Sequence, residues 1–317
     1  GLRAAAYRHL RRHWQFINEL LLFDMDHKHF FGIHIYGADQ SPHFLHSTAL
    51  YHPDTALRSL KHDGSGEEPG FKNPHTGTWD LRPHASRIEY INESTLRIWQ
   101  SATDSEDWRS TSMVSTVNSV ASHTLAALAA QSRNGDLELR FSTGWNETTD
   151  FQKGLLSKQW GAASWSDAIL QGPHLHISTP LYKQPNISML HNQDWTSTDP
   201  ETLPTSAQPF TQYKPADDRA TYDRLYTHWD GSPARDHYRI AWRRMAKNTN
   251  ERTLIPAIIP PGTAHVHPIY SAATPSARPT VLPLILAGAS SLLADFQIRA
   301  RSRNDIINQD FERLPNL

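Results

Sequence analysis

The sequence places arginines and amides at spacings that suit contacts with nucleic acid. Arg235, Arg239, Arg243 and Arg244 recur at helical spacing just before an asparagine-containing segment. Guanidinium and amide groups contact phosphates and form paired hydrogen bonds with base edges, although a solvated helix face explains such arginines equally well. The residues that we expect to contact DNA are Lys153, Lys158, Lys183, Arg239, Arg243, Arg244, Asn248, Asn250, Arg299, Arg301 and Arg303.

Paired histidines and abundant tryptophans leave two other kinds of site open. His174 with His176, and His265 with His267, place two imidazoles on one face of a strand, as in some zinc or iron enzymes. No third ligand can be assigned, and alternating polar positions on a half-exposed strand give the same pattern. The 10 tryptophans are compatible with a carbohydrate-binding module. The sequence contains neither GxxxxGK[ST] nor GxGxxG, and no GxSxG.

The composition is that of an ordinary globular protein. Of the 317 residues, 38% are hydrophobic and 20% charged, with a net charge of −1 and no cysteine. Disulfides and thiolate metal sites are therefore excluded. No apolar run approaches the roughly 18 residues of a membrane span, so we expect a cytoplasmic protein with no membrane partner. Because the chain begins at Gly1 rather than methionine, we expect a fragment.

Hydrophobic periodicity predicts a mixed α/β fold. Apolar residues three or four apart predict a helix over residues 7–21, with a strand beginning near Trp14 as the alternative. Strands are predicted over 30–36 and 254–259, and helices over 235–246 and around 284–296. Residues 193–215 are rich in Thr, Ser, Asp and Pro, which indicates an irregular segment.

Several short segments of the chain occur in the order in which similar segments occur in one protein family. They are RRHWQFINEL (11–20) with FGIHIYG (31–37), GPH (172–174) with PLYK (180–183), NTNERTLIPAIIP (248–260), and SSLLADF (290–296) with DFERLP (310–315). Together they resemble the C-terminal half of Type IIG restriction-modification DNA methyltransferases. Within these segments the resemblance implies a structural rather than a DNA-contacting role for five residues, which are Gly172, Pro173, His174, Glu251 and Arg252.

The resemblance implies a division of the chain and of the chemistry. Residues 1–55 would be the tail of a Rossmann-like methyltransferase domain, and 56–317 a target-recognition domain of α+β fold that recognises double-stranded DNA. In that family the catalytic half binds S-adenosylmethionine and methylates adenine through an Asn-Pro-Pro-Tyr motif, which this sequence lacks. Whether this chain is an enzyme stays open. We expect no cofactor in it, with catalysis supplied by a methyltransferase domain in cis or by a partner chain.

Overall fold

The chain folds into two compact units of mixed α/β structure. The computed structural model describes residues 1–316 except 104, 246–249, 275–279 and 302–304. Unit 1 comprises Gly1–Gln131 with Ala300–Ser302, and unit 2 comprises Ser132–Arg299 with Arg303–Leu317. Several small sheets and helices alternate in both, which confirms the mixed fold class. The boundary predicted at residue 55 does not coincide with this division, because Thr55 lies inside a helix of unit 1.

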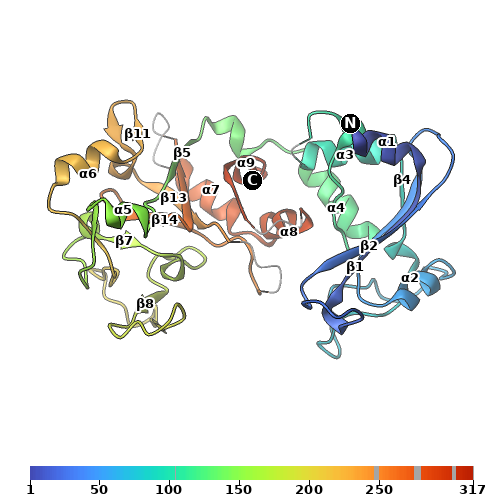
Figure 1. Ribbon diagram of the computed structural model, residues 1–317, viewed down its shortest axis with the longest axis horizontal. Coiled ribbons are helices and arrows are strands. Elements are labelled where there is room, and N and C mark those ends of the chain that lie inside the picture. Colours follow the sequence, from blue (N-terminus) through green and yellow to red (C-terminus); the bar gives the residue numbers. More distant parts are fainter. Residues whose placement is uncertain (104, 246–249, 275–279, 302–304, 317) are drawn as a thin grey trace. The chain divides into compact units, whose positions relative to one another are not determined.

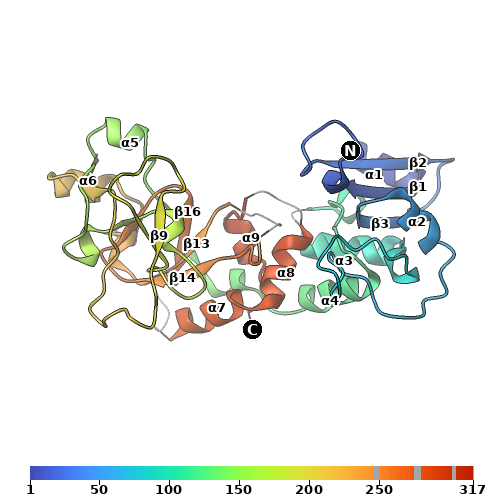
Figure 2. The same ribbon diagram turned by 90° about the horizontal axis from the view of Figure 1, so that it is seen from below.

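Unit 1 is built on a four-stranded sheet of order β2-β1-β3-β4. Strand β1 runs antiparallel to β2 and parallel to β3. Helices α3 and α4 lie against one face of this sheet (Figure 2). The elements are α1 (Leu2–His9), β1 (Leu10–Ile17), β2 (Phe30–Tyr36), β3 (Phe44–Leu50), α2 (Pro53–Ser59), β4 (Glu89–Ile91), α3 (Glu93–Ala102) and α4 (Ser119–Ala129).

The helix predicted over residues 7–21 ends early. Helix α1 stops at His9, and β1 begins at Leu10 rather than near Trp14. Strand β1 pairs with β2 along its length, from Leu10 opposite Tyr36 to Ile17 opposite Phe30. This pairing buries Trp14 and Phe16, so sheet formation overrides the helical spacing of the apolar residues. The strand predicted over 30–36 is confirmed as β2.

Two neutral histidines are stacked in the core of unit 1. The Nδ1 atoms of His13 and His46 lie 2.9 Å apart, and Nε2 of His46 is 3.1 Å from the carbonyl oxygen of Val114. The Nε2–H of His46 therefore donates to Val114, and its bare Nδ1 accepts from the Nδ1–H of His13. Burial is the main cause that lowers the pKa of His13 to about 2 and that of His46 to about 4.

Unit 2 surrounds an antiparallel sheet of order β14-β13-β16-β5 (Figure 1). Short two-stranded pairings complete it. Its elements are β5 (Arg140–Thr143), α5 (Thr149–Gln152), β6 (Leu156–Ser157), β7 (Ile169–Leu170), β8 (Lys183–Pro185), β9 (Trp195–Ser197), β10 (Lys214–Pro215), α6 (Arg219–Leu225), β11 (His228–Trp229), β12 (Ser232–Pro233), β13 (Arg239–Arg243), β14 (Pro256–Ile259), β15 (Ala264–His265), β16 (Ile269–Ala273), α7 (Val281–Ala289), α8 (Leu292–Ala300) and α9 (Asn308–Glu312).

Both faces of the unit 2 sheet are buried. Ile240 and Trp242 of β13 pack against the C-terminal helices, where the Trp242 ring stacks on Phe311 with ring centroids 4.2 Å apart. Ala241, on the other face of β13, packs with Leu175 in the region of loops and short strands. Among the described helices none alone is long and apolar enough to span a bilayer; only α7 with α8, bent by 61°, reaches that length as a pair.

The helix predicted over residues 235–246 is wrong, because Ala234–Asp236 form only a short 3-10 turn and Arg239–Arg243 form β13. Partners on both sides, β14 and β16, satisfy its backbone, and its apolar residues are buried on both faces. The strand predicted over 254–259 is confirmed as β14. The single late helix predicted around 284–296 is confirmed as helical, but it is divided into α7 and α8, which are bent by 61° at the break between them.

The histidine pair makes unit 1 sensitive to acid. The unfolded chain, with histidine pKa values near 6.5, binds protons that the folded pair excludes, so the free energy of unfolding falls as pH is lowered from 6.5 towards 4. Each such histidine adds a slope of about 1.4 kcal/mol per pH unit. We expect His46→Gln to reduce this slope by about one proton in denaturant unfolding between pH 6 and 5. The exposed His43→Gln is the control, and an unchanged slope in His46→Gln would contradict the neutral pair.

Candidate nucleic-acid interface

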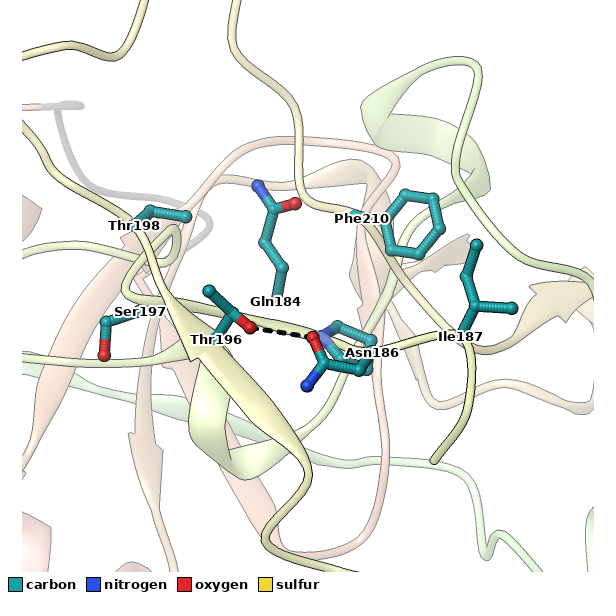
Figure 3. Close-up of a pocket in the computed structure, with 8 residues that line it drawn as sticks. Gln184, Asn186, Ile187, Thr196, Ser197, Thr198 and Phe210 are labelled. Atoms are coloured by element: carbon teal, nitrogen blue, oxygen red, sulfur yellow. Dashed lines mark hydrogen bonds between the residues drawn. The ribbon is translucent and has the colours of Figure 1, made fainter. Parts of the chain in front are cut away.

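A surface hollow of about 510 Å³ lies at the hairpin formed by β8 and β9 (Figure 3). Its walls come from the hairpin and from Phe210, which follows the end of β9 at Ser197 along the chain. We call it the hairpin hollow, and it is lined by Gln184, Pro185, Asn186, Ile187, Thr196, Ser197, Thr198 and Phe210.

The register of the hairpin decides which side chains share a face. Gln184 is paired with Thr196, and Lys183 with Ser197, so each pair points to one side of the ribbon. Figure 3 shows the Gln184 amide extending between Thr198 and the Phe210 ring. The hollow is thus lined by consecutive residues of both hairpin segments, with the Gln184–Thr196 pair on one side of the ribbon, and an aromatic ring closes it at one side.

The loop that joins the two strands is held by one carboxylate. Asp194 accepts hydrogen bonds from Nδ2 of Asn186 at 2.6 Å, from Oγ of Ser188 at 2.7 Å and from the backbone N–H of Leu190 at 3.1 Å. These bonds lower the pKa of Asp194, whose charge is thereby spread over three donors. Oδ1 of Asn186 in turn accepts from Oγ1 of Thr196 at 2.7 Å. The loop is therefore ordered by its own side chains.

His174 connects the two walls of the hollow. Its Nδ1 accepts from the backbone N–H of Gln171 at 2.9 Å, so its proton lies on Nε2 and is donated to the carbonyl of Phe210 at 3.0 Å. The Trp195 ring of β9 meets the His174 ring edge-on, with centroids 4.9 Å apart. Burial lowers the pKa of His174 to about 4, which keeps the ring neutral at pH 7.

The hollow is electrically neutral, with lysines nearby. None of the eight described lining residues is charged. Lys183 of β8 immediately precedes Gln184, and its Nζ is 5.3 Å from the centroid of the Tyr182 ring. Lys158 is exposed and lies two residues from Trp160, whose ring stacks on Phe210 at 6.0 Å. Neither lysine pairs with a carboxylate among the residues that the structure describes.

Arg239 does not face solvent and takes no part in the interface. Its side chain is fully buried, and its guanidinium donates to the carbonyl of Thr263, to the hydroxyl of Tyr226 at 3.1 Å and to that of Ser271 at 3.3 Å. Burying a guanidinium requires such partners, and exposing it to a phosphate would forfeit them. The expectation that Arg239 contacts DNA is therefore corrected to a structural role.

Arg243 and Arg244 are also committed to the fold. Arg243 shares a face of β13 with Arg239 and donates to the carbonyl of Leu175. Arg244 pairs with Asp305 at 2.8 Å and donates to the ring of His267 at 3.1 Å. Both side chains are half-buried. Their placement gives no free basic surface, because each guanidinium already has a partner within unit 2.

The late basic cluster is divided between the two units. Arg299 pairs with Asp295 at 2.7 Å and donates to the carbonyls of Asn250 and Glu251, whereas Arg301 belongs to unit 1. Asn250 and Glu251 are exposed. Nε of Arg252 lies 3.5 Å from Oδ1 of Asp295. The predicted Asn248 and Arg303 lie outside the described residues.

Lys153 lies away from the hairpin hollow in a second, smaller cavity. This cavity has a volume of about 280 Å³ and is also lined by Trp145 and Tyr226. Nζ of Lys153 is 3.0 Å from Oδ1 of Asp150 and both groups are in solvent contact, so the pair contributes little to stability.

The histidines of each predicted pair contact different partners and do not form a common site. His174 and His265 are buried, and Nε2 of His265 is 2.8 Å from Oγ of Ser271. His176 packs on Tyr182, and His267 accepts from Arg244. Within the part of the chain that the structure describes, no three His, Asp or Glu side chains are grouped so that they could hold a metal ion.

Most of the hollow was not predicted from the sequence. Residues 193–215 were expected to be irregular, yet Trp195–Ser197 form β9 and Phe210 completes the wall. The part of the sequence that pointed to this region was the GPH segment, because Gly172 and Pro173 begin the short turn that positions His174. Glu251 and Arg252, the other structural residues of the resemblance, lie elsewhere in unit 2.

No protein-family model matches the chain, and no curated protein matches it in sequence.

Replacing His174 should loosen the hollow. His174→Ala leaves the Phe210 carbonyl and the Gln171 N–H without partners, at a cost of about 1–3 kcal/mol each. We expect faster amide hydrogen exchange in residues 183–198 and a lower free energy of unfolding. Gln193→Ala, at an exposed glutamine of the same loop whose side chain bonds none of the described residues, should leave both unchanged. Equal exchange in wild type and His174→Ala would show that His174 does not support the hairpin.

Proposed function

We propose that unit 2 recognises double-stranded DNA, with the β8–β9 hairpin directed into the major groove. The carrying observation is the lining of the hairpin hollow, where amide, hydroxyl and apolar groups are brought together with no charged side chain among the eight described residues. Base edges in the major groove present hydrogen-bond donors, acceptors and methyl groups, which such a lining complements. A two-stranded ribbon has dimensions that this groove admits.

The proposal needs phosphate contacts on either side of the hollow. Lys183 on the hairpin and Lys158 beside Trp160 are the predicted lysines that lack a carboxylate partner among the described residues. Lysine contacts with phosphates release counterions and fix the position of the protein on the duplex, whereas base contacts provide specificity. Asn250 is a further exposed amide that the proposal retains as a candidate contact.

The resemblance assigns the chemical step to another part of the complete system. In this proposal S-adenosylmethionine and the adenine-methylating residues belong to a catalytic domain, present in cis or as a partner chain. The contribution of this chain is to position the duplex so that an adenine can be taken out of the stack. The open polar face and its buried support suit that positioning role.

A carbohydrate ligand is the second candidate. The Trp160–Phe210 stack beside amides and hydroxyls is a combination that a sugar ring also uses. Lys158 and Lys183 favour a polyanionic ligand over a neutral sugar. Binding measurements with neutral oligosaccharides and with duplex DNA distinguish the two candidates. Binding of neutral oligosaccharides with no binding of duplex DNA would support the second candidate and overturn the first.

Salt-dependent binding tests the DNA proposal. Fluorescence anisotropy with labelled random-sequence duplexes should show an affinity whose logarithm falls linearly with the logarithm of salt concentration. Lys158→Ala and Lys183→Ala should each reduce the magnitude of that slope by about 1, because each removes one phosphate contact.

The control is Lys61→Ala, an exposed lysine of unit 1, which should leave the slope unchanged. Absence of duplex binding at low salt would contradict the proposal. A slope that neither Lys158→Ala nor Lys183→Ala alters would show that the hairpin side of unit 2 is not the DNA-binding surface.

A further inference from the structure

We infer that the hairpin hollow recognises one A·T base pair, and that Gln184 is the specificity-determining residue. The inference rests on the proposed DNA-binding function and goes beyond it by naming a base pair and the side chain that selects it. It follows from which polar groups of the hollow are free and which are already bonded.

Gln184 is the amide of the hollow that remains free. Its side chain makes no hydrogen bond with any described residue, and Figure 3 shows it extending into the hollow from β8. Asn186, the other amide, is held in place at both ends, since its oxygen accepts from Thr196 and its nitrogen donates to Asp194. The backbone pairing of β8 with β9 fixes the direction in which the Gln184 side chain leaves the strand.

The hydroxyls of the hollow cannot discriminate in its place. Oγ1 of Thr196 donates to Asn186, and the single O–H of Thr198 is directed towards the neighbouring carbonyls of Leu181 and Tyr182. Ser197 points to the opposite side of the ribbon from Gln184, because neighbouring residues of a strand alternate. A serine hydroxyl also bonds donors and acceptors alike.

A free carboxamide matches adenine among the four bases. It donates and accepts side by side, as required by the N7 acceptor and N6 amino group of adenine, whereas guanine presents two acceptors. Ile187 at the rim is 68% exposed, and the half-buried Phe210 ring forms the facing wall. Apolar groups at this position suit the methyl group of the paired thymine.

The test is selection of bound sites from a random duplex library by the 317-residue chain and its variants. Wild type should select a motif that contains a strongly preferred A·T position. Gln184→Ala should reduce discrimination at that one position by roughly 5- to 150-fold, the range of one bidentate contact, and leave the salt slope unchanged. Gln184→Glu keeps the shape but only accepts, so it should shift the preference towards C·G, whose cytosine amino group donates.

Gln193→Ala is the matched control, because Gln193 is an exposed glutamine of the same loop outside the lining. If wild type selects a motif and Gln184→Ala selects the same one, the inference is overturned while DNA recognition stands. If wild type binds no duplex DNA, the proposed function fails and the inference fails with it. Loss of discrimination at one A·T position, with the control unchanged, supports both.

Discussion

The hydrogen bond from Nε2 of His174 to the carbonyl of Phe210 joins segments 36 residues apart and sets the geometry of the hollow. Nε2 donates this bond while the bare Nδ1 of the neutral ring accepts from the backbone N–H of Gln171, and burial favours the neutral state. The Trp195 ring of the hairpin packs against the same imidazole, so both walls of the hollow contact His174. Preorganisation of this kind lowers the ordering cost of binding.

The arginines are used to build unit 2, and this limits how it can bind a polyanion. Arg239 is buried among hydroxyls, Arg244 pairs with Asp305, and Arg299 pairs with Asp295. In the proposed DNA complex, non-specific binding to phosphates would therefore depend on few lysines, in keeping with the net charge of −1. A larger share of the binding free energy in that proposed complex would then come from neutral groups that contact base edges.

The sequence predicted the buried strand at 254–259 and the late helices because long apolar patterns decide such elements. It misassigned 235–246, since a spacing of four places Arg239 and Arg243 on one face in a helix and in a strand alike. The hollow was beyond prediction because its walls, Gln184 and Phe210, meet only through tertiary contacts. His174 was identified as structural by resemblance, but its partners lie far away in sequence.

Hydrogen–deuterium exchange of the chain with and without duplex DNA tests most directly whether the hairpin is the contact surface. We expect protection on binding to be concentrated in residues 182–198 and around Phe210, with the buried strand β13 unaffected. Protection confined to unit 1, or to other parts of unit 2 with the hairpin unchanged, would contradict it.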